Sequence, residues 1–391
     1  MIRHFPSLQV IAKTRLEEIT AQGLLRKHKT VDGPQGPVIS INGSAILNFC
    51  SNDYLGLSAH PVLVAAVKQS VERYGVGGCA SRLMCGNSSA HAGLEERLAQ
   101  FTRRERALVF STGYMANLAL IGVFTGRAGV VIGDRLNHAS LIDAPMLAGA
   151  TLKRYKHADP VSLQHRLEET DTVGNRLVVT ESVFSMDGDI APLPAIAAAC
   201  AAAQAPLLVD DAHGFGVLGK NGRGALEHFG LDSHAVPLLM ATFGKALGAF
   251  GAFIAGSADL IECLIQSGRT YIYTTALPPA YAVAACCALD LVERERWRAD
   301  HLNALIERFR HGATQLGLPV TDSRTPIQPI FIGDPRRATE ISDQLFKKGI
   351  FIAAIRSPTV PKHTDRLRIT LTAGHTEAQI DHLLSALSDQ I

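Results

Sequence analysis

The fold of this chain is decided by three stretches: VVTESVFSMDGD (residues 178–189), LLVDDAHGFGVLG (207–219) and LLMATFGKALGAFGAF (238–253). Each begins with a short apolar run and ends in polar or glycine-rich residues, which is typical of a buried strand followed by a loop. A fourth stretch, LVFSTGYMAN (108–117), has the same form and opens a helix. Strands that alternate with helices in this way predict an α/β fold, with a mostly parallel sheet covered on both faces.

The remaining elements follow from the same periodicity. The chain splits into an N-terminal arm over 1–48, a large domain over 49–283 and a smaller α+β domain over 284–391. In the arm we expect a helix over 8–28 and short strands around 37–49. The expected strands of the two domains cover 107–110, 129–132, 177–180, 206–209, 237–242, 327–332, 350–355 and 367–371.

Composition excludes several classes of protein. The 391 residues carry a net charge of +2, so nothing favours a nucleic-acid or anionic-membrane partner. The most apolar window, 190–209, contains three prolines and reads as a helix followed by a strand, so we expect no membrane span. Seven cysteines without CxxC spacing argue against disulfides and metal sites. With no targeting segment recognised, these features predict a cytoplasmic protein.

The candidate catalytic and cofactor-binding residues lie where the predicted strands end. Lys245 lies in a glycine-rich turn, Asp210 and His213 follow another strand, and Gly113 opens a helix whose free N–H groups suit an anion. Because parallel strands end at one edge, an amine, a carboxylate and a phosphate site should meet there. Pyridoxal 5'-phosphate requires those groups: a lysine for its aldehyde, a carboxylate for its ring nitrogen and donors for its phosphate. The sequence therefore predicts a pyridoxal-phosphate enzyme.

Each signal alone has a structural alternative. Asp210 and Asp211 are both placed to cap the next helix, and His138 is equally explained as a capping or core histidine. A glycine-rich turn after a strand is usually only a turn. The occurrence of all these groups at successive strand ends is what favours a site.

Five segments resemble the α-oxoamine synthases, pyridoxal-phosphate-dependent transferases of fold type I, the aspartate-aminotransferase fold. The resemblance extends from about Asn48 to Gly374 and implies a large domain with a seven-stranded, mostly parallel sheet. Cys79, Cys85 and Phe250 depart from the family pattern, and we expect them to shape the acyl pocket. The segments are NFCSNDYLGL (48–57), DRLNHASLIDA (134–144), VFSMDGDIAPL (183–193), VDDAHGFGVLGKNGRG (209–224) and TFGKALGAFGA (242–252).

The resemblance implies a role for each residue at the cofactor. Lys245 would bond to the cofactor and move the α-proton of the amino acid, and His138 would stack on the ring and touch substrate. Asp210 would pair with the ring nitrogen and His213 with the phenolic oxygen. The other residues expected at the cofactor are Ser185 and Thr242 beside the ring, and Gly113 and Tyr114 at the phosphate.

The resemblance also implies partners. Thr274 or Thr275 would reach the phosphate of a neighbouring subunit, which implies a homodimer with shared active sites. Arg368 would clamp the substrate carboxylate, and Arg26 and Thr359 would touch substrate. The strings DDAHG (210–214), YIYTTALPP (271–279) and IRSPTVPKHTDRLRITLTAGH (355–375) favour L-alanine and a pimeloyl thioester of coenzyme A or acyl-carrier protein.

Other functions stay open at this stage. A sister enzyme would use glycine or serine in place of alanine. A pyridoxal-binding regulator would need a basic DNA-reading module, which the sequence lacks, and a non-catalytic subunit would usually have lost Lys245. A nicotinamide dehydrogenase would need a GxGxxG turn that opens a helix after the first strand, with an acidic residue about 20 positions further on, and the sequence has no such combination.

Overall fold

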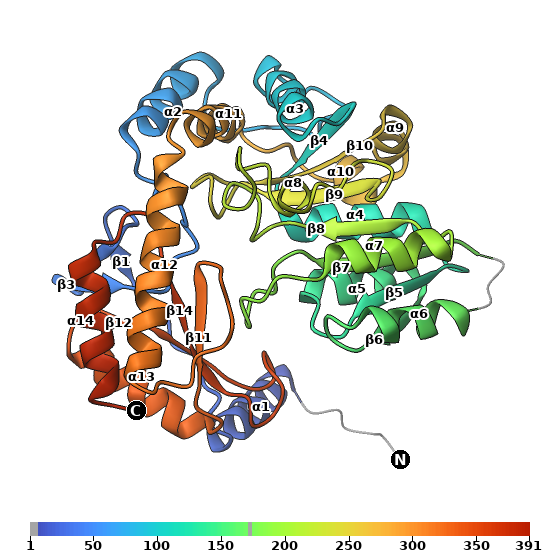
Figure 1. Ribbon diagram of the computed structural model, residues 1–391. Helices are drawn as coiled ribbons and strands as arrows, with labels where there is room; N and C mark the ends of the chain where they lie inside the picture. Colours follow the sequence, from blue (N-terminus) through green and yellow to red (C-terminus); the bar gives the residue numbers. More distant parts are fainter. Residues whose placement is uncertain (1–6, 171–173) are drawn as a thin grey trace.

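The centre of the molecule is a seven-stranded sheet with the order β4-β10-β9-β8-β7-β5-β6 (Figure 1). The structure is a computed structural model that describes residues 7–170 and 174–391. Neighbouring strands from β9 to β6 are parallel, whereas β10 runs antiparallel to both of its neighbours. The predicted α/β class and mostly parallel sheet are confirmed. The strands are β4 (Arg106–Phe110), β5 (Val130–Asp134), β6 (Thr151–Tyr155), β7 (Arg176–Glu181), β8 (Leu207–Asp210), β9 (Leu238–Thr242) and β10 (Ala252–Gly256).

Two of these strands were not among the predicted ones. Strand β6, with the sequence TLKRY, lies at the sheet edge and is mostly half-exposed, so it lacks the apolar run of a buried strand. Strand β10 follows the glycine-rich turn after Lys245, where the glycines obscure the strand pattern. Edge exposure and a glycine-rich approach therefore hid both strands.

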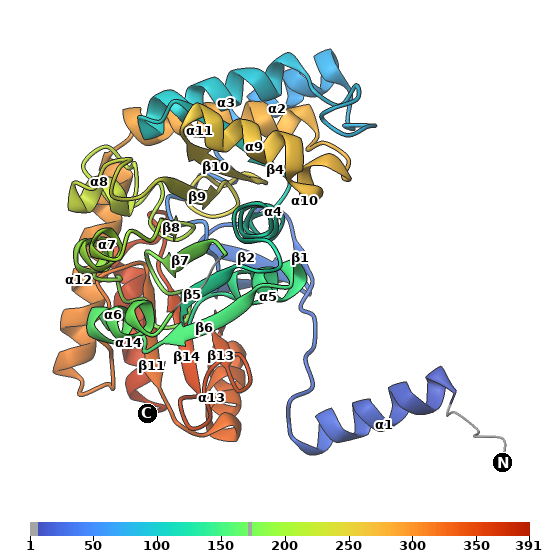
Figure 2. The same cartoon turned by 90° about the vertical axis from the view of Figure 1, so that its right-hand side faces the viewer.

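Helices cover both faces of the sheet (Figures 1 and 2). Alternate side chains of each strand point to opposite faces: Leu208 and Met240 pack towards α4, while Val209 and Leu239 pack towards α7. The helices on the α4 side are α4 (Gly113–Thr125), α5 (Ala139–Ala148), α9 (Ala258–Ser267) and α10 (Arg269–Ile272), and those on the other side are α2 (Pro61–Tyr74), α3 (Ser89–Thr102), α6 (Pro160–Glu168), α7 (Leu193–Ala202), α8 (Ala225–Phe229) and α11 (Pro279–Arg294).

A smaller part of the molecule is built from both ends of the chain. The predicted strand over 350–355 is divided in two: β12 (Ile350–Phe351) joins β3, and β13 (Ala353–Ile355) joins β14. The domain limits at 48 and 283 stay a prediction. The other elements here are β1 (Val31–Asp32), β2 (Val38–Ile41), β3 (Ser44–Asn48), β11 (Ile327–Phe331), β14 (Arg366–Thr370), α12 (Trp297–Gln315), α13 (Pro335–Lys347) and α14 (Glu377–Ser388).

The N-terminal helix is shorter than predicted. Helix α1 (Leu8–Ala21) has its C-cap at Gln22, and Gly23 follows with a φ of +67°, a conformation that favours glycine. The helix buries none of its residues and stands away from the body of the molecule (Figure 2). Within the described ranges, no helix is both long and apolar enough to span a membrane.

His157 ties the loop after β7 to the sheet. Its Nδ1 lies 3.1 Å from Asp134 Oδ1 at the end of β5, and its Nε2 lies 3.0 Å from Asp189 Oδ2 in the loop. Burial alone would lower the pKa of His157, but the hydrogen bonds to the two carboxylates raise it to about 10. The histidine is therefore a cation at neutral pH, and it holds the part of the loop that follows Ser185.

Replacing His157 by Gln should lower the free energy of unfolding by about 3 kcal/mol at pH 6. The pKa of the folded state lies above that of a free histidine, so this stabilisation is complete below about pH 6.5 and is lost as the pH rises through about 10. Urea unfolding of both proteins at pH 6, 8 and 10 measures the difference. The exposed His165→Gln serves as control, with a change below about 0.5 kcal/mol; a His157→Gln difference independent of pH would contradict the assignment.

Candidate active site

A cavity of about 190 Å³ opens at the carboxyl ends of β7, β8 and β9, beside the first turns of α4 and α5. In sheets of this kind ligands bind at this edge. Seven of the residues predicted for the site meet in its wall. The cavity is lined by Gly113, Tyr114, Asn117, His138, Ser140, Glu181, Asp210, Ala212, His213, Met240, Thr242 and Lys245.

The amine of Lys245 is held by His213, which in turn contacts Tyr54. Lys245 Nζ lies 2.7 Å from His213 Nε2, and His213 Nδ1 lies 2.5 Å from the hydroxyl of Tyr54. Burial lowers the pKa of Lys245 to about 8, against the attraction of Asp210 and Glu181. The lysine thus reaches the neutral, nucleophilic form far more readily than an exposed lysine does.

The same hydrogen bonds allow a proton to change position. Burial, with Lys245 and Arg368 nearby, lowers the pKa of His213 well below its usual range, so the ring is neutral. A neutral ring donates from one nitrogen only. When Lys245 is charged it donates to Nε2, and when it is neutral Nε2–H donates to the amine while Tyr54 donates to Nδ1. Burial raises the pKa of Tyr54 to about 12, which keeps its hydroxyl protonated.

The two adjacent aspartates have different surroundings. Asp210 accepts hydrogen bonds from Asn117 Nδ2 and the Ala212 N–H, at 2.9 and 3.0 Å, and lines the cavity. Asp211 points away and accepts the N–H of Ala225 at the start of α8. Capping therefore explains Asp211, whereas Asp210 remains available to the cavity.

His138 caps a helix and also lies in the cavity wall. It is the N-cap of α5, where Nδ1 accepts the Ser140 N–H at 3.2 Å and lies 2.9 Å from the Ser140 hydroxyl. It also lines the cavity, and burial together with Lys245 lowers its pKa. Because Nδ1 accepts, the neutral ring carries its proton on Nε2, as assigned from this hydrogen-bond pattern.

The residues that the sequence did not indicate are Asn117, Ser140, Glu181, Ala212 and Met240 in the cavity wall, and Tyr54 beside it. Glu181 ends β7 with 3% of its surface exposed, Asn117 bridges Asp210 and Ser140, and Tyr54 contacts His213. An acidic residue closing an apolar strand, as in VVTE, was the available signal for Glu181. Asn117 and Tyr54 had none, because their partners lie 93 and 159 residues away.

Arg368 lies beside the cavity and is held by hydrogen bonds to the loop after β7, to its own strand and to Asn52. It is 7% exposed and donates from Nε to the Ser185 carbonyl, from Nη1 to the Thr370 hydroxyl and from Nη2 to Asn52. These contacts use three of the five N–H groups of a guanidinium. Asn52 Oδ1 also lies 3.3 Å from the hydroxyl of Tyr54, which links Arg368 to the hydrogen bonds that end at Lys245. The side chain of Thr242, at the end of β9, donates to the Gly251 carbonyl.

Several predicted residues lie outside the cavity. Arg26 and Thr359 are exposed on segments joined by a 2.5 Å contact from Arg356 Nη1 to the Gly23 carbonyl. Six others are also absent from the cavity wall. These are Ser185, Thr274, Thr275, Cys79, Cys85 and Phe250, of which Thr274 lines a separate groove beside α4 and α5 and Phe250 contacts Tyr281.

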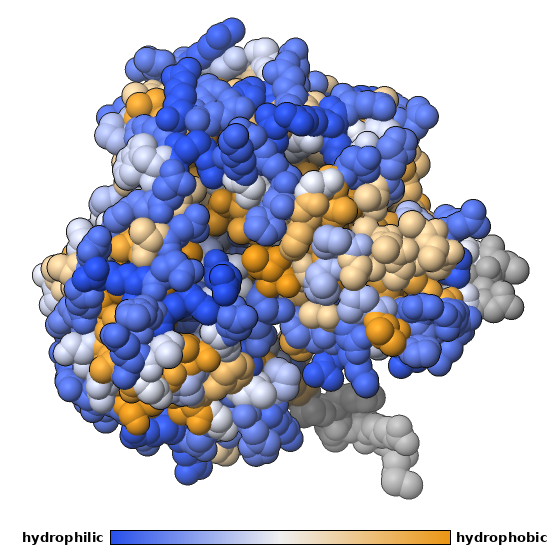
Figure 3. Space-filling view, viewed as in Figure 1, coloured by the Kyte–Doolittle hydropathy of each residue, from blue (hydrophilic) through white to orange (hydrophobic). Residues whose placement is uncertain are grey.

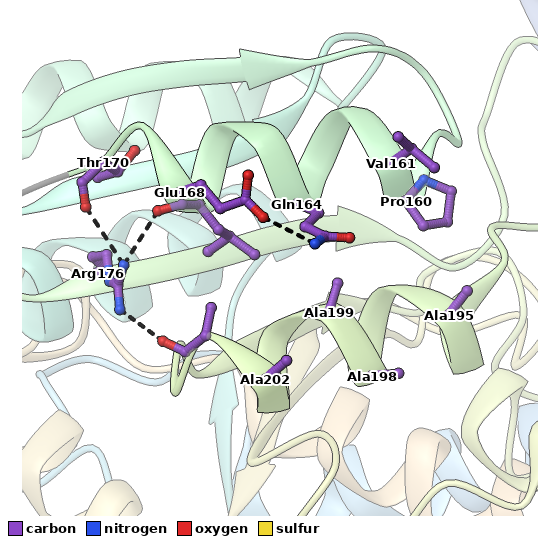
Figure 4. A pocket seen from close by; sticks show the side chains of 12 residues that line it. Pro160, Val161, Gln164, Glu168, Thr170, Arg176, Ala195, Ala198, Ala199 and Ala202 are labelled. Atoms are coloured by element: carbon purple, nitrogen blue, oxygen red, sulfur yellow. Dashed lines mark hydrogen bonds between the residues drawn. The ribbon is translucent and has the colours of Figure 1, made fainter.

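A groove of about 930 Å³ lies between α6 and α7 (Figure 4). Alanine side chains form its α7 wall, and this surface is pale over α7 in Figure 3. Arg176 donates to three backbone carbonyls, those of Leu167, Thr170 and Ala203, at 2.7–3.5 Å. The groove lacks convergent reactive groups in the part of its wall that the structure describes, so the chemistry belongs to the smaller cavity.

The residues of the cavity fit pyridoxal phosphate. Lys245 offers an amine of lowered pKa and Asp210 a carboxylate, while the first N–H groups of α4, at Gly113 and Tyr114, have no partner within the helix. Asn117 Oδ1 is buried without a hydrogen-bond partner among the described residues. An amine, a carboxylate and an anion site converge as this cofactor requires.

Comparison with known proteins agrees with this geometry. The sequence pattern of the family described as aminotransferase class I and II matches residues 44–387. The chain is 54% identical over 375 residues to an 8-amino-7-oxononanoate synthase of Thioalkalivibrio sulfidiphilus, covering 96% of each chain. It is also 54% identical over 376 residues to that of Pseudomonas aeruginosa strain PAO1, covering 96% of this chain and 93% of the relative.

Solved structures are similar over most of the chain. A serine palmitoyltransferase of S. paucimobilis with bound PLP aligns with a TM-score of 0.93 at 28% identity, covering 98% of each chain. An 8-amino-7-oxononanoate synthase of Francisella tularensis aligns with a TM-score of 0.78 at 33% identity, covering 88% of this chain and 97% of that one. The comparison of sequences and the comparison of solved structures agree on the fold and on pyridoxal phosphate as the cofactor.

Replacing Tyr54 by Phe should lower the free energy of unfolding by about 1–3 kcal/mol, because the buried His213 Nδ1 loses its partner. Urea unfolding at pH 7 measures the change. Tyr74→Phe is the matched control: its hydroxyl bonds to Ser89 at the surface, where water replaces it, so less than about 0.5 kcal/mol should be lost. Equal changes in the two variants would contradict the role given to Tyr54.

Proposed function

The chain belongs to the class I and II aminotransferase family, and we propose that it joins L-alanine to a pimeloyl thioester, giving 8-amino-7-oxononanoate, a step of biotin biosynthesis. It is a pyridoxal-phosphate-dependent acyltransferase. A carbon–carbon bond forms between the alanine Cα and the thioester carbonyl, the carbon–sulfur bond breaks, and the alanine carboxylate leaves as carbon dioxide. The observation that carries the proposal is the buried Lys245 amine among Asp210, His213 and His138 in a relative of these synthases.

The cavity residues supply the groups that hold the cofactor. Asp210 would keep a proton on the ring nitrogen, and His213 would donate from Nε2 to the phenolic oxygen. His138 would lie against the ring, with Thr242 and Ser185 at its edge. Gly113 and Tyr114 would direct backbone N–H groups to the phosphate.

The protein moves one proton at a defined atom. When bound, pyridoxal phosphate accepts the electron pair left when the α-proton of the amino acid is removed. Lys245 Nζ takes that proton, because its lowered pKa makes it a base near neutral pH. Arg368 would bind the alanine carboxylate with its two remaining N–H groups, which matches the bidentate geometry of such pairs.

Arg26 would meet the far end of the acyl substrate, and Thr359 would also touch substrate. Arg26 and Thr359 each lie three residues from the contact between Gly23 and Arg356. Two segments far apart in the sequence are thus close together, and Arg26 supplies a cation that suits the free carboxylate of a pimeloyl chain.

We also propose a homodimer in which Thr274 or Thr275 completes the partner's phosphate site. Thr274 lines a groove of about 630 Å³ between α4, α5 and the end of α10. Large apolar side chains are exposed beside it: Met146, Leu147 and Tyr273 are 70%, 74% and 72% exposed. A patch of this kind favours burial against a second copy.

All seven cysteines are free, which favours a cytoplasmic location.

The function is tested by adding pyridoxal phosphate to the purified protein and following its visible absorption and free thiol. L-Alanine should change the absorption, and thiol should appear only when pimeloyl thioester is added as well. Lys245→Ala should retain the cofactor non-covalently and lose at least about a thousandfold in rate. A response chiefly to glycine or serine would replace the proposed substrate, and full turnover by Lys245→Ala would refute the proton transfer.

The shared site is tested with two inactive variants. Lys245→Ala and a copy with Thr274→Ala and Thr275→Ala should each have little activity. When the two are unfolded together and refolded as a mixture, hybrid dimers contain one site with the wild-type lysine and both wild-type threonines. Thiol release should therefore recover to a fraction of the wild-type rate. No recovery despite hybrid formation, shown by tags of different mass, would contradict a site shared through these threonines.

A further inference from the structure

Glu181 is a buried carboxyl in the cavity to which no role has been given above. It ends β7 and lies in register with Asp210, which ends the adjacent parallel strand β8. Side chains in register on neighbouring parallel strands point to the same face, about 5 Å apart. Glu181 is 3% exposed, and the cavity wall includes it together with Lys245.

Glu181 determines where His138 sits. Its Oε1 accepts the N–H of His138 at 2.5 Å, directly before α5 begins. The adjacent Asn137 makes a second connection, since its side chain donates to the Val179 carbonyl and accepts the Glu181 N–H. The backbone at the base of the His138 side chain is therefore held to β7 by both residues.

A chain of hydrogen bonds also connects His138 with Asp210. From His138 Nδ1 the hydrogen bonds run to the Ser140 hydroxyl, then to Asn117 Nδ2, and from Asn117 to Asp210 Oδ2, each at 2.9 Å. Asp210 in turn lies beside Glu181 on the neighbouring strand. A change at Glu181 thus reaches both His138 and Asp210.

The groups that face Glu181 have opposing effects on the pKa of its carboxyl. Burial and the neighbouring Asp210 raise the pKa of Glu181 to about 8, with Asp134 acting in the same direction. Lys245 and the N–H of His138 act in the opposite direction. Any additional cation in the cavity favours the ionised carboxylate.

We propose that Glu181 is a positioning residue of the cofactor site, which orients His138 through its backbone N–H and supplies a second carboxyl beside Asp210. The proposal rests on the proposed function only in requiring pyridoxal phosphate in this cavity. Glu181 acts through its neighbours, because its Oε1 is engaged with His138.

Two substitutions separate the two parts of the role. In Glu181→Gln the side-chain oxygen still accepts the His138 N–H, but the side chain can no longer ionise. The visible absorption of the bound cofactor changes with pH, and the midpoint of this change should fall by about one unit. A carboxylate favours the protonated, cationic form of a nearby base, so its removal lowers the pKa of that base. In Glu181→Ala the acceptor is lost as well, and the cofactor should bind about tenfold more weakly.

The matched control is Glu95→Gln. Glu95 likewise accepts a backbone N–H, that of Val109 at 2.9 Å, and pairs with Arg82, but it is absent from the cavity wall. This control should lower the melting temperature and leave the midpoint pH unchanged. It therefore shows what a purely structural loss of a carboxylate does.

An unchanged midpoint in Glu181→Gln, or unchanged cofactor affinity in Glu181→Ala, would overturn the proposal whatever the melting temperatures. Because Glu181→Gln retains the hydrogen bond, the test does not depend on Glu181→Ala folding. These readouts need only bound cofactor and no acyl substrate. A wild-type protein that fails to release thiol but shows the shifted midpoint in Glu181→Gln would refute the proposed reaction and support the role of Glu181.

Discussion

The candidate active site depends on the burial of one amine among carboxyls at the carboxyl ends of parallel strands. Removing a lysine from water disfavours its charged form, while Asp210 and Glu181 favour it, and the balance lowers the pKa of Lys245 to about 8. Both carboxyls are brought there by register, since β7 and β8 are adjacent and end together. A nucleophilic lysine is thus a consequence of the sheet topology.

The loop after β7 connects this edge with the smaller sheet. Arg368 and Arg366, both on β14, donate to the Ser185 carbonyl and to Asp187 in the loop. At its other end the loop is tied to β5 by His157. The position of Arg368 relative to Lys245 therefore depends on ion pairs and hydrogen bonds that converge on this single loop.

Much of this arrangement was predictable from the sequence. The apolar runs that end at Thr180, Val209 and Thr242 indicated buried strands, and residues that follow such strands meet at one edge in a parallel sheet. Lys245, Asp210 and His213 were found for that reason. Strands β6 and β10 were missed, because edge exposure and a glycine-rich approach remove the apolar pattern on which the prediction relies.

The sequence by itself determined the fold class, the cofactor and the residues that carry the chemistry, because strand ends and their polar residues are local features of the chain. Only the tertiary structure decided which of two adjacent aspartates faces the cavity, that Tyr54 completes the hydrogen bonds of His213, and that Glu181 holds His138. Those outcomes depend on contacts between residues 14 to 159 positions apart. Such contacts arise from strand order and register, and no periodicity within a single segment encodes them.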